Sequence, residues 1–175
     1  MEGQFFYKKL VKEIPLNAIW ITKDIFCIPI KSRFGDLQPN INSFLKFLNI
    51  SYFIQGHENY NRYGLSNQIA AETVYLVPVN IKLINPYWKK IYKFKKVDKK
   101  LFKKFSYIEY IVYDILSNLN NIFSDLFHND NIKIKYTKKL IKDLKIKYKS
   151  DLNVSKCLKE ASKNNKNLKN LFNIK

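Results

Sequence analysis

The sequence is poor in the residues on which metal sites, redox chemistry and phosphate-binding loops depend. Its 175 residues include two cysteines, two histidines and four glycines. Cys27 and Cys157 stand far apart and neither belongs to a C-x-x-C pattern, so no zinc site or redox pair is expected. With so few glycines and no glycine-rich phosphate loop, a nucleotide-binding fold is not expected either. We therefore predict no cofactor and no bound metal.

Long apolar runs are also missing, and no stretch of about 18 apolar residues is present to cross a bilayer. Residues 1–20 lack the apolar core and small-residue cleavage site of a secretory signal, while Glu2 and Glu13 are atypical of a mitochondrial presequence. We expect an intracellular protein without a membrane partner. If it works in an organelle, we expect it to be made there or to have lost an import signal.

Acidic residues are scarce. Six Glu and eight Asp face 32 basic residues, of which only Arg33 and Arg62 are arginines, and the net charge is +18. The abundance of Lys, Asn, Ile, Tyr and Phe is typical of AT-rich coding DNA. A cytosolic enzyme encoded by such DNA would usually balance its many Lys with a similar number of Glu, and this chain does not. A charge this large is self-repulsive unless an anion neutralises it, and the phosphates of RNA do so with release of counterions.

The charge is concentrated in the second half of the chain. Residues 1–80 carry 8 basic and 6 acidic groups, whereas residues 81–175 carry 24 basic and 8 acidic groups. This asymmetry predicts that the first half contributes most of the folded core and the second half most of the RNA contact.

Apolar patterning predicts an α+β domain over residues 1–127, in which a small antiparallel sheet is covered by a long amphipathic helix. A basic, mainly helical extension is predicted to follow over residues 128–175. The elements expected in the first part are a helix at 5–14, a hairpin of strands 18–22 and 25–30, a turn at 31–36, a short helix or turn at 41–47, a strand at 50–54, a loop at 56–64 and a strand at 73–84. Pro29 and Pro78 favour edge strands or a bulge.

An apolar stripe with heptad spacing predicts one unbroken helix over residues 98–127. Its members are Leu101, Phe105, Ile108, Val112, Ile115, Leu119, Ile122 and Leu126. The stripe has three interpretations: the core face of a domain helix, which we favour, a hairpin with a helix at 136–148, or a dimerising coiled coil. Residues 132–136 alternate like a strand but also fit the start of that second helix, and Asp151 or Asn153 is expected to cap a last helix containing Val154, Leu158 and Ala161.

Two lysine-rich stretches predict phosphate contacts. Residues 82–104 hold ten Lys and one Asp, and residues 133–149 hold eight Lys and one Asp. Aromatic side chains are interleaved in the first stretch, where Trp88 and Tyr92 either stack on unpaired bases or turn into the core. The predicted RNA-binding residues are Arg33, Arg62, Trp88, Lys89, Lys90, Tyr92, Lys93, Lys95, Lys96, Lys99, Lys100, Lys138, Lys139 and Lys142.

One set of residues could support catalysis. Cleavage of RNA without a metal needs a base, an acid and a cation, which Lys31, Ser32, Arg33 and His57, with Arg62 and Tyr63 nearby, could supply. The alternative, which we favour, is that these residues form a turn and a loop whose arginines contact phosphate.

A short pattern in the first half resembles the type III toxin endoribonucleases of the ToxN and AbiQ type. It comprises Phe26-Cys27-Ile28-Pro29-Ile30-Lys31-Ser32, followed by 44–46, 63–64 and 76–79. The resemblance implies an active site at the end of a Pro-apolar-x-Ser strand, at Ser32. The basic run that follows in those toxins is replaced here by Phe34-Gly35-Asp36.

Taken together, the residues predict an RNA-binding structural protein, an rRNA-binding component of a ribosome, in contact with neighbouring proteins of a large ribonucleoprotein assembly. The AT-rich bias favours a mitochondrial or other organellar ribosome, with a cytoplasmic location as the alternative. The rival function is a metal-independent endoribonuclease, so whether the protein is an enzyme is left open, with a non-enzyme favoured. A third interpretation is a viral or phage nucleic-acid-binding protein, which would share the composition.

Overall fold

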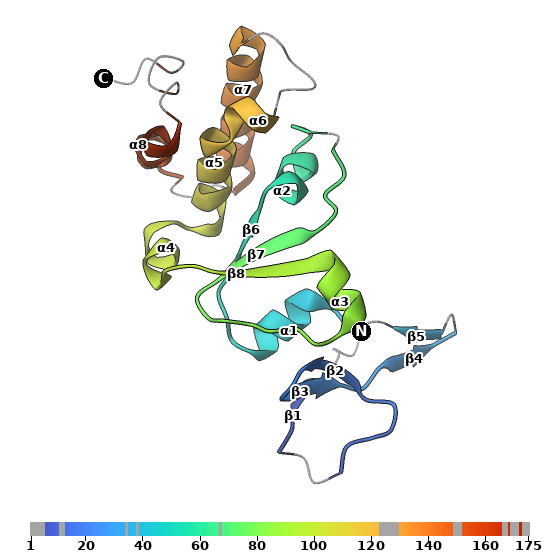
Figure 1. Cartoon of the computed structure of the whole chain (residues 1–175). Helices are drawn as coiled ribbons and strands as arrows, with labels where there is room; N and C mark the ends of the chain where they lie inside the picture. The colour runs from blue at the N-terminus through green and yellow to red at the C-terminus, as the bar shows by residue number, and fades with distance from the viewer. Residues whose placement is uncertain are drawn as a thin grey trace. The chain divides into compact units, whose positions relative to one another are not determined.

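The structure is a computed structural model that describes residues 6–10, 13–33, 35–37, 39–66, 68–122, 130–148, 152–165, 168 and 172. It is a mixed α+β protein, as the apolar patterning predicts, and its chain divides into two compact units (Figure 1). The first unit contains residues 1–52 and 74–98, and the second contains residues 53–73 and 99–175. Residues on both sides of the predicted boundary between residues 127 and 128 belong to the second unit.

Most strands of the structure lie in the first unit. They are β1 (Phe6–Lys8), β2 (Ile19–Thr22), β3 (Ile25–Cys27), β4 (Ile30–Ser32), β5 (Gly35–Leu37), β7 (Thr73–Val77) and β8 (Tyr92–Lys96). The hairpin predicted at 18–30 is present as β2 and β3, which pair antiparallel. β4 and β5 form a second antiparallel hairpin, and β7 neighbours β8 in another sheet.

Three predictions for this unit are wrong. Part of the helix expected at 5–14 is the strand β1, which pairs with β3 and places Phe6 opposite Cys27. β3 is therefore a central strand, and it ends before Pro29 instead of including that residue at an edge. The strand expected at 73–84 ends at Val77, because Pro78 cannot donate a ladder hydrogen bond.

Two helices complete the first unit. Helix α1 (Ile41–Phe47) is present as predicted, and the Asn40 side chain caps its first turn. Helix α3 (Pro86–Ile91) is capped by Asn85, whose side chain accepts a hydrogen bond from Trp88 N at 2.9 Å. The rings of Phe44 on α1 and Trp88 on α3 meet edge to face with centroids 5.4 Å apart, in this unit's core.

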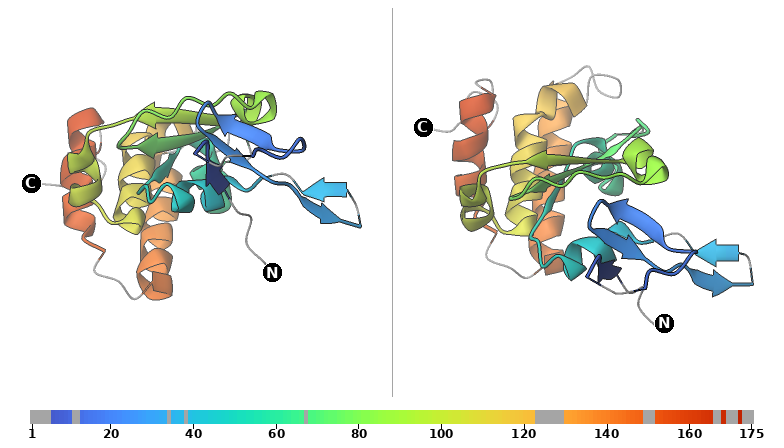
Figure 2. Two further views of the ribbon diagram at one scale, coloured as in Figure 1. Left: turned by 90° about the horizontal axis from the view of Figure 1, so that it is seen from below. Right: turned by 60° about the horizontal axis from the view of Figure 1, so that its bottom comes forward.

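The second unit is mainly helical. It contains β6 (Phe53–Gln55), α2 (His57–Arg62), α4 (Lys99–Lys104), α5 (Tyr107–Ser117), α6 (Leu119–Ile122), α7 (Asp130–Tyr148) and α8 (Val154–Asn164). α8 packs along α5, and α7 runs near α5 in the views of Figures 1 and 2. The loop expected at 56–64 is instead the helix α2, while the strand expected at 50–54 corresponds to β6.

The prediction of one unbroken helix at 98–127 is wrong, although much of its apolar stripe is buried as a core face would be. Ser106 ends the preceding segment and begins α5 with a capping box, in which its side chain accepts from Glu109 N and its own backbone N–H donates to the Glu109 carboxylate. Asn118 ends α5. The residues from 123 to 127 lie outside the described part of the chain. Much of the stripe is buried, which favours the core interpretation; Phe105, Val112, Ile115, Leu119 and Ile122 are at most 4% exposed.

Beyond residue 129, the described residues form helices where the sequence left strand or helix open. The strand pattern at 132–136 is overridden, and these residues belong to α7. α8 begins where the sequence predicts, since the Asn153 side chain accepts a hydrogen bond from Lys156 N at 2.9 Å. Cys157 and Ala161 of α8 are fully buried.

Candidate nucleic-acid interface

Helix α7 has one buried face and one lysine face. Ile134, Thr137, Ile141 and Leu144 form the inward side, and of these the last three are buried. Beside this buried side, lysines recur with the spacing i, i+3, i+4, i+7 and i+10, which keeps them on one exposed face of an α-helix. This α7 lysine face consists of Lys135, Lys138, Lys139, Lys142 and Lys145, all of which are exposed.

The α7 lysine face is about 15 Å long, since a helix rises about 1.5 Å per residue. Asp143 is an exposed carboxylate on the same helix, beside this face. The ammonium of Lys138 also lies 5.8 Å from the centre of the Phe172 ring. An ordered row of ammonium groups of this length is able to contact several successive phosphates of a nucleic acid.

A second group of lysines lies in the first unit, on α3 and β8. Lys89 and Lys90 are exposed in the last turn of α3, and Lys93, Lys95 and Lys96 are exposed along β8. Tyr92 and Phe94 belong to the same strand, and both of their rings contact Tyr75. We call these five lysines the α3–β8 lysine group.

The burial of Trp88 favours the core alternative for that residue. Its side chain is 0% exposed, and its ring packs against Phe44 and Tyr92. A side chain enclosed in this way cannot stack on a base. Tyr87, the preceding residue, is 54% exposed and was not among the residues predicted from the sequence. The exposure of Tyr87 follows from the helical conformation of α3, because adjacent residues of a helix face different directions and Trp88 faces the core.

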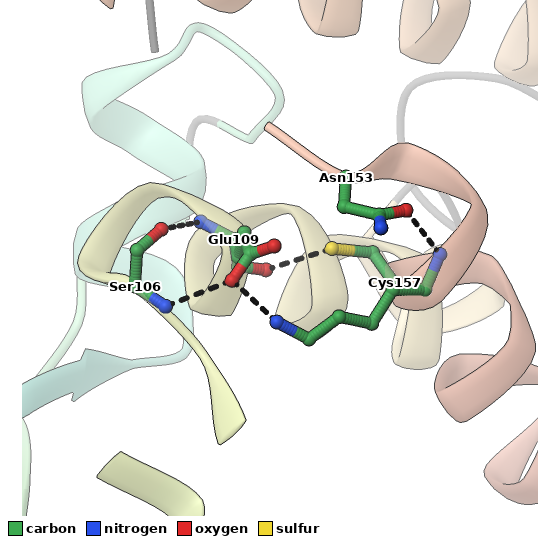
Figure 3. A network of polar contacts seen from close by, with 5 residues as sticks. Ser106, Glu109, Asn153 and Cys157 are labelled. Carbon is green, nitrogen blue, oxygen red and sulfur yellow. Dashed lines mark hydrogen bonds and ion pairs between the residues drawn. The ribbon is translucent and has the colours of Figure 1, made fainter. Parts of the chain in front are cut away.

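Several lysines of the second unit are already engaged by carboxylates. Lys104 and Lys163 both contact the Glu160 carboxylate, at 2.6 and 2.9 Å, and these bonds lower the pKa of Glu160. Lys156 Nζ lies 2.7 Å from Glu109 Oε2 (Figure 3). These three lysines are engaged within the second unit by ion pairs with Glu109 and Glu160.

The remaining predicted contacts are spread over both units. Lys99 and Lys100 are exposed on α4, and Arg33 is exposed in the turn between β4 and β5. Arg62 ends α2, and its guanidinium lies 3.6 Å from the Glu58 carboxylate.

The residues considered for catalysis are divided between the two units. Lys31 and Ser32 end β4 and Arg33 follows them, all in the first unit, whereas His57 begins α2 in the second. His57 Nδ1 lies 3.5 Å from Ser66 Oγ, and its ring meets the Tyr60 ring edge to face. Neither unit by itself therefore holds the full set.

The most strongly perturbed carboxyl among the described residues is Asp114 on α5, which is 2% exposed. Its Oδ2 accepts a hydrogen bond from Gly56 N at 3.1 Å, and its Oδ1 accepts from Asn118 Nδ2 at 3.2 Å. Burial raises the pKa of Asp114 to about 6, although hydrogen bonds from Gly56 N, Tyr60 and Gln55 oppose this rise. These contacts tie the start of α2 to α5, which is a structural role.

Among the described residues, no three His, Cys, Asp or Glu side chains gather in a way that would hold a metal ion. In the same part of the chain, no helix is both long and apolar enough to cross a membrane. Comparison with known proteins returns no matching family model, no matching curated protein and no matching solved structure.

Proposed function

We propose that this chain is an RNA-binding protein whose α7 lysine face contacts the phosphate backbone. The observation that carries the proposal is the arrangement of α7, where five exposed lysines form one face beside the side buried by Thr137, Ile141 and Leu144. A helix that only had to be solvated would gain nothing from collecting charges of one sign, because like charges on one face repel each other. Phosphates on that face would remove the repulsion.

The α3–β8 lysine group is a second region of phosphate contact in this proposal. Phosphate contacts position a protein on RNA without reading its sequence. In agreement with this, the aromatic residues that accompany these lysines in the sequence are packed against one another, as for Tyr92 and Phe94 on Tyr75. The proposed contact is therefore mainly electrostatic and strongly dependent on salt.

The narrower proposal is a structural role in a ribosome, as an rRNA-binding component of a mitochondrial or other organellar particle. It is supported by the charge of +18 and by the small number of acidic residues, which an AT-rich genome alone does not explain. Neighbouring proteins of the same ribonucleoprotein particle are the other proposed partners.

The salt dependence of RNA binding tests the broad proposal. We expect the double substitution Lys139→Gln and Lys142→Gln to weaken binding and to reduce the slope of log Kobs against log salt by roughly 0.7–0.9 for each phosphate that is no longer neutralised. The matched control is Lys104→Gln with Lys163→Gln, which removes the same charge from lysines that bind Glu160. A slope for Lys139→Gln with Lys142→Gln that equals the slope of the parent chain would show that the α7 lysine face is only solvated.

Sedimentation tests the narrower proposal. In a lysate, the tagged protein is expected to sediment with one ribosomal subunit at moderate salt and to leave it as the salt is raised. If the protein stays at the top of the gradient under all conditions while the purified chain binds RNA, the ribosomal assignment is wrong and the broad proposal stands.

A further inference from the structure

Two adjoining hollows in the first unit share Asp24 and Ile25. Each has a volume of about 530 Å³, which lies in the range of about 300–1,000 Å³ found for small-molecule sites. The first is bounded by the hairpin of β2 and β3, the end of α1 and the segment 79–84. The second lies between the end of β1 and the start of β3.

The walls of the first hollow are largely aliphatic, with polar groups among them. Ile25 is buried and the other aliphatic side chains are partly or substantially exposed to solvent. The aliphatic lining consists of Ile25, Leu48, Ile50, Val79, Ile81 and Ile84. Thr22, Asp24 and Asn80 supply a hydroxyl, a carboxylate and an amide. This combination suits a flat, apolar group with a polar edge.

Asp24 is the one acidic residue of both linings, which together contain four lysines. Lys23 and Lys82 belong to the first hollow, and Lys8 and Lys9 belong to the second. Four ammonium groups against one carboxylate leave an excess of positive charge around the apolar walls. A ligand that fits has to combine an apolar body with negative charge outside it.

Backbone hydrogen bonds hold these groups on regular elements. Asp24 closes the turn between β2 and β3, where its N–H donates to Thr22 Oγ1 at 3.3 Å and its carbonyl accepts from Lys9 N at 2.9 Å. The segment 79–84 is tied to the hairpin, because Ile84 N donates to the Ile21 carbonyl at 2.8 Å. None of these bonds uses the Asp24 carboxylate.

We propose that these hollows receive an unpaired nucleotide of single-stranded RNA. The base lies against the aliphatic walls of the first hollow, and Lys8, Lys9, Lys23 and Lys82 contact the phosphates on either side of it. This inference rests on the proposed RNA binding and adds to it a preference for single strands, since a paired and stacked base cannot enter a hollow.

The carboxylate of Asp24 gives the hollow a preference among bases. An ionised carboxylate only accepts hydrogen bonds, so it favours bases with an exocyclic amino group, as in the pairing of Asp or Glu with the amino group of cytosine. Oligocytidine is therefore expected to bind more tightly than oligouridine of the same length.

Filling the hollow is the first test, made on the full chain. Val79 lines the hollow and is 37% exposed, so Val79→Trp is able to occupy the space without entering the core. We expect the affinity for oligocytidine to fall about tenfold, the order of effect of displacing one base from its site, and the affinity for a blunt RNA duplex to be unchanged. Ile69→Trp is the matched control, because Ile69 is 94% exposed and belongs to the second unit.

Asp24→Asn is the second test, and it does not depend on how the indole of the first variant packs. Removing one negative charge is expected to raise the affinity for every RNA, while the preference for oligocytidine over oligouridine disappears. A role in the fold alone would not change that preference.

The outcomes separate the inference from the proposal beneath it. If Val79→Trp and Ile69→Trp bind oligocytidine equally well, or Asp24→Asn keeps the parent preference, the nucleotide site is wrong while RNA binding stands. If the parent chain binds neither single strands nor duplex at low salt, both are wrong. Tight duplex binding with no affinity for single strands also overturns the nucleotide site alone.

Discussion

Lys156 Nζ lies 2.7 Å from Glu109 Oε2, and the Glu109 side chain is only 8% exposed (Figure 3). Burial opposes the ionisation of Glu109, but the hydrogen bonds from Lys156 and from Ser106 N lower its pKa overall. Cys157 Sγ donates to the Glu109 carbonyl at 3.3 Å, so two successive residues of α8 meet one residue of α5. This connection makes α8 part of the second unit's core.

Breaking this ion pair is expected to destabilise the second unit. Lys156→Met keeps the apolar stem but removes the ammonium partner of the Glu109 carboxylate, which keeps its hydrogen bond from Ser106 N. We expect the free energy of unfolding to fall by about 1–3 kcal/mol, the usual cost of leaving a buried polar group short of a partner. Urea unfolding followed by circular dichroism measures this change.

The double variant Glu109→Gln with Lys156→Met is the control for this prediction. It removes the unpaired charge together with its partner, so part of the lost stability should return. If the loss of stability in the double variant equals the sum of the losses in Lys156→Met and Glu109→Gln alone, the two side chains act independently. The ion pair would then not be what holds α8.

Asp114 should make the free energy of unfolding fall as the pH rises, which is the opposite of the usual effect of a carboxylate. Its pKa is about 6 in the folded state against an ordinary 3.8, so the folded chain binds more protons than the unfolded chain between these values. The free energy of unfolding contributed by Asp114 therefore falls as the pH rises from about 4 to 6, by about 3 kcal/mol, and is level above that range.

Asp114→Asn isolates this effect. Glu109 and Glu160 have lowered pKa values and act in the opposite direction, so the quantity to measure is the difference between parent and variant at each pH. We expect that difference to change between about pH 4 and 6 and to be constant from about pH 7 to 8.

The protein is expected to bind RNA without cleaving it. General acid–base cleavage requires its groups within hydrogen-bond reach of one scissile phosphate. The unit that contains Lys31, Ser32 and Arg33 has no histidine of its own to act as the base. Incubation with AT-rich transcripts in EDTA, followed by a search for 2′,3′-cyclic phosphate ends, measures this. Cleavage that disappears in Ser32→Ala or Arg33→Ala, with binding retained, would establish the endoribonuclease in place of the structural protein.

Elements whose signals are local could be predicted from the sequence. The hairpin of β2 and β3 follows from two β-branched and aromatic runs separated by Lys23-Asp24, and α8 follows from the cap at Asn153 with apolar residues at helical spacing. The exposure of the lysines on α7 was predictable for the same reason. Lysine is seldom buried, and the helical period places the charges.

Elements that depend on partners far away in the sequence could not be predicted. The residues of β1 have a helical pattern, yet pairing with β3 satisfies their backbone groups and decides their conformation. The heptad stripe predicts one helix because apolar periodicity does not detect a helix cap, although Ser106 and Glu109 have the capping-box signature in the sequence. The inward turn of Trp88 was undecidable for a similar reason, because nothing near it in the chain specifies Phe44 as its neighbour.

The two cysteines fall one in each compact unit, Cys27 in the first and Cys157 in the second. Both thiols are free and buried, and burial raises their pKa values to about 11 and about 12. A thiol-specific reagent therefore reaches either sulfur mainly after its unit opens. The labelling rates of the two cysteines would therefore report how often each compact unit opens by itself. The measurement needs no substitution, because each unit contains one natural cysteine.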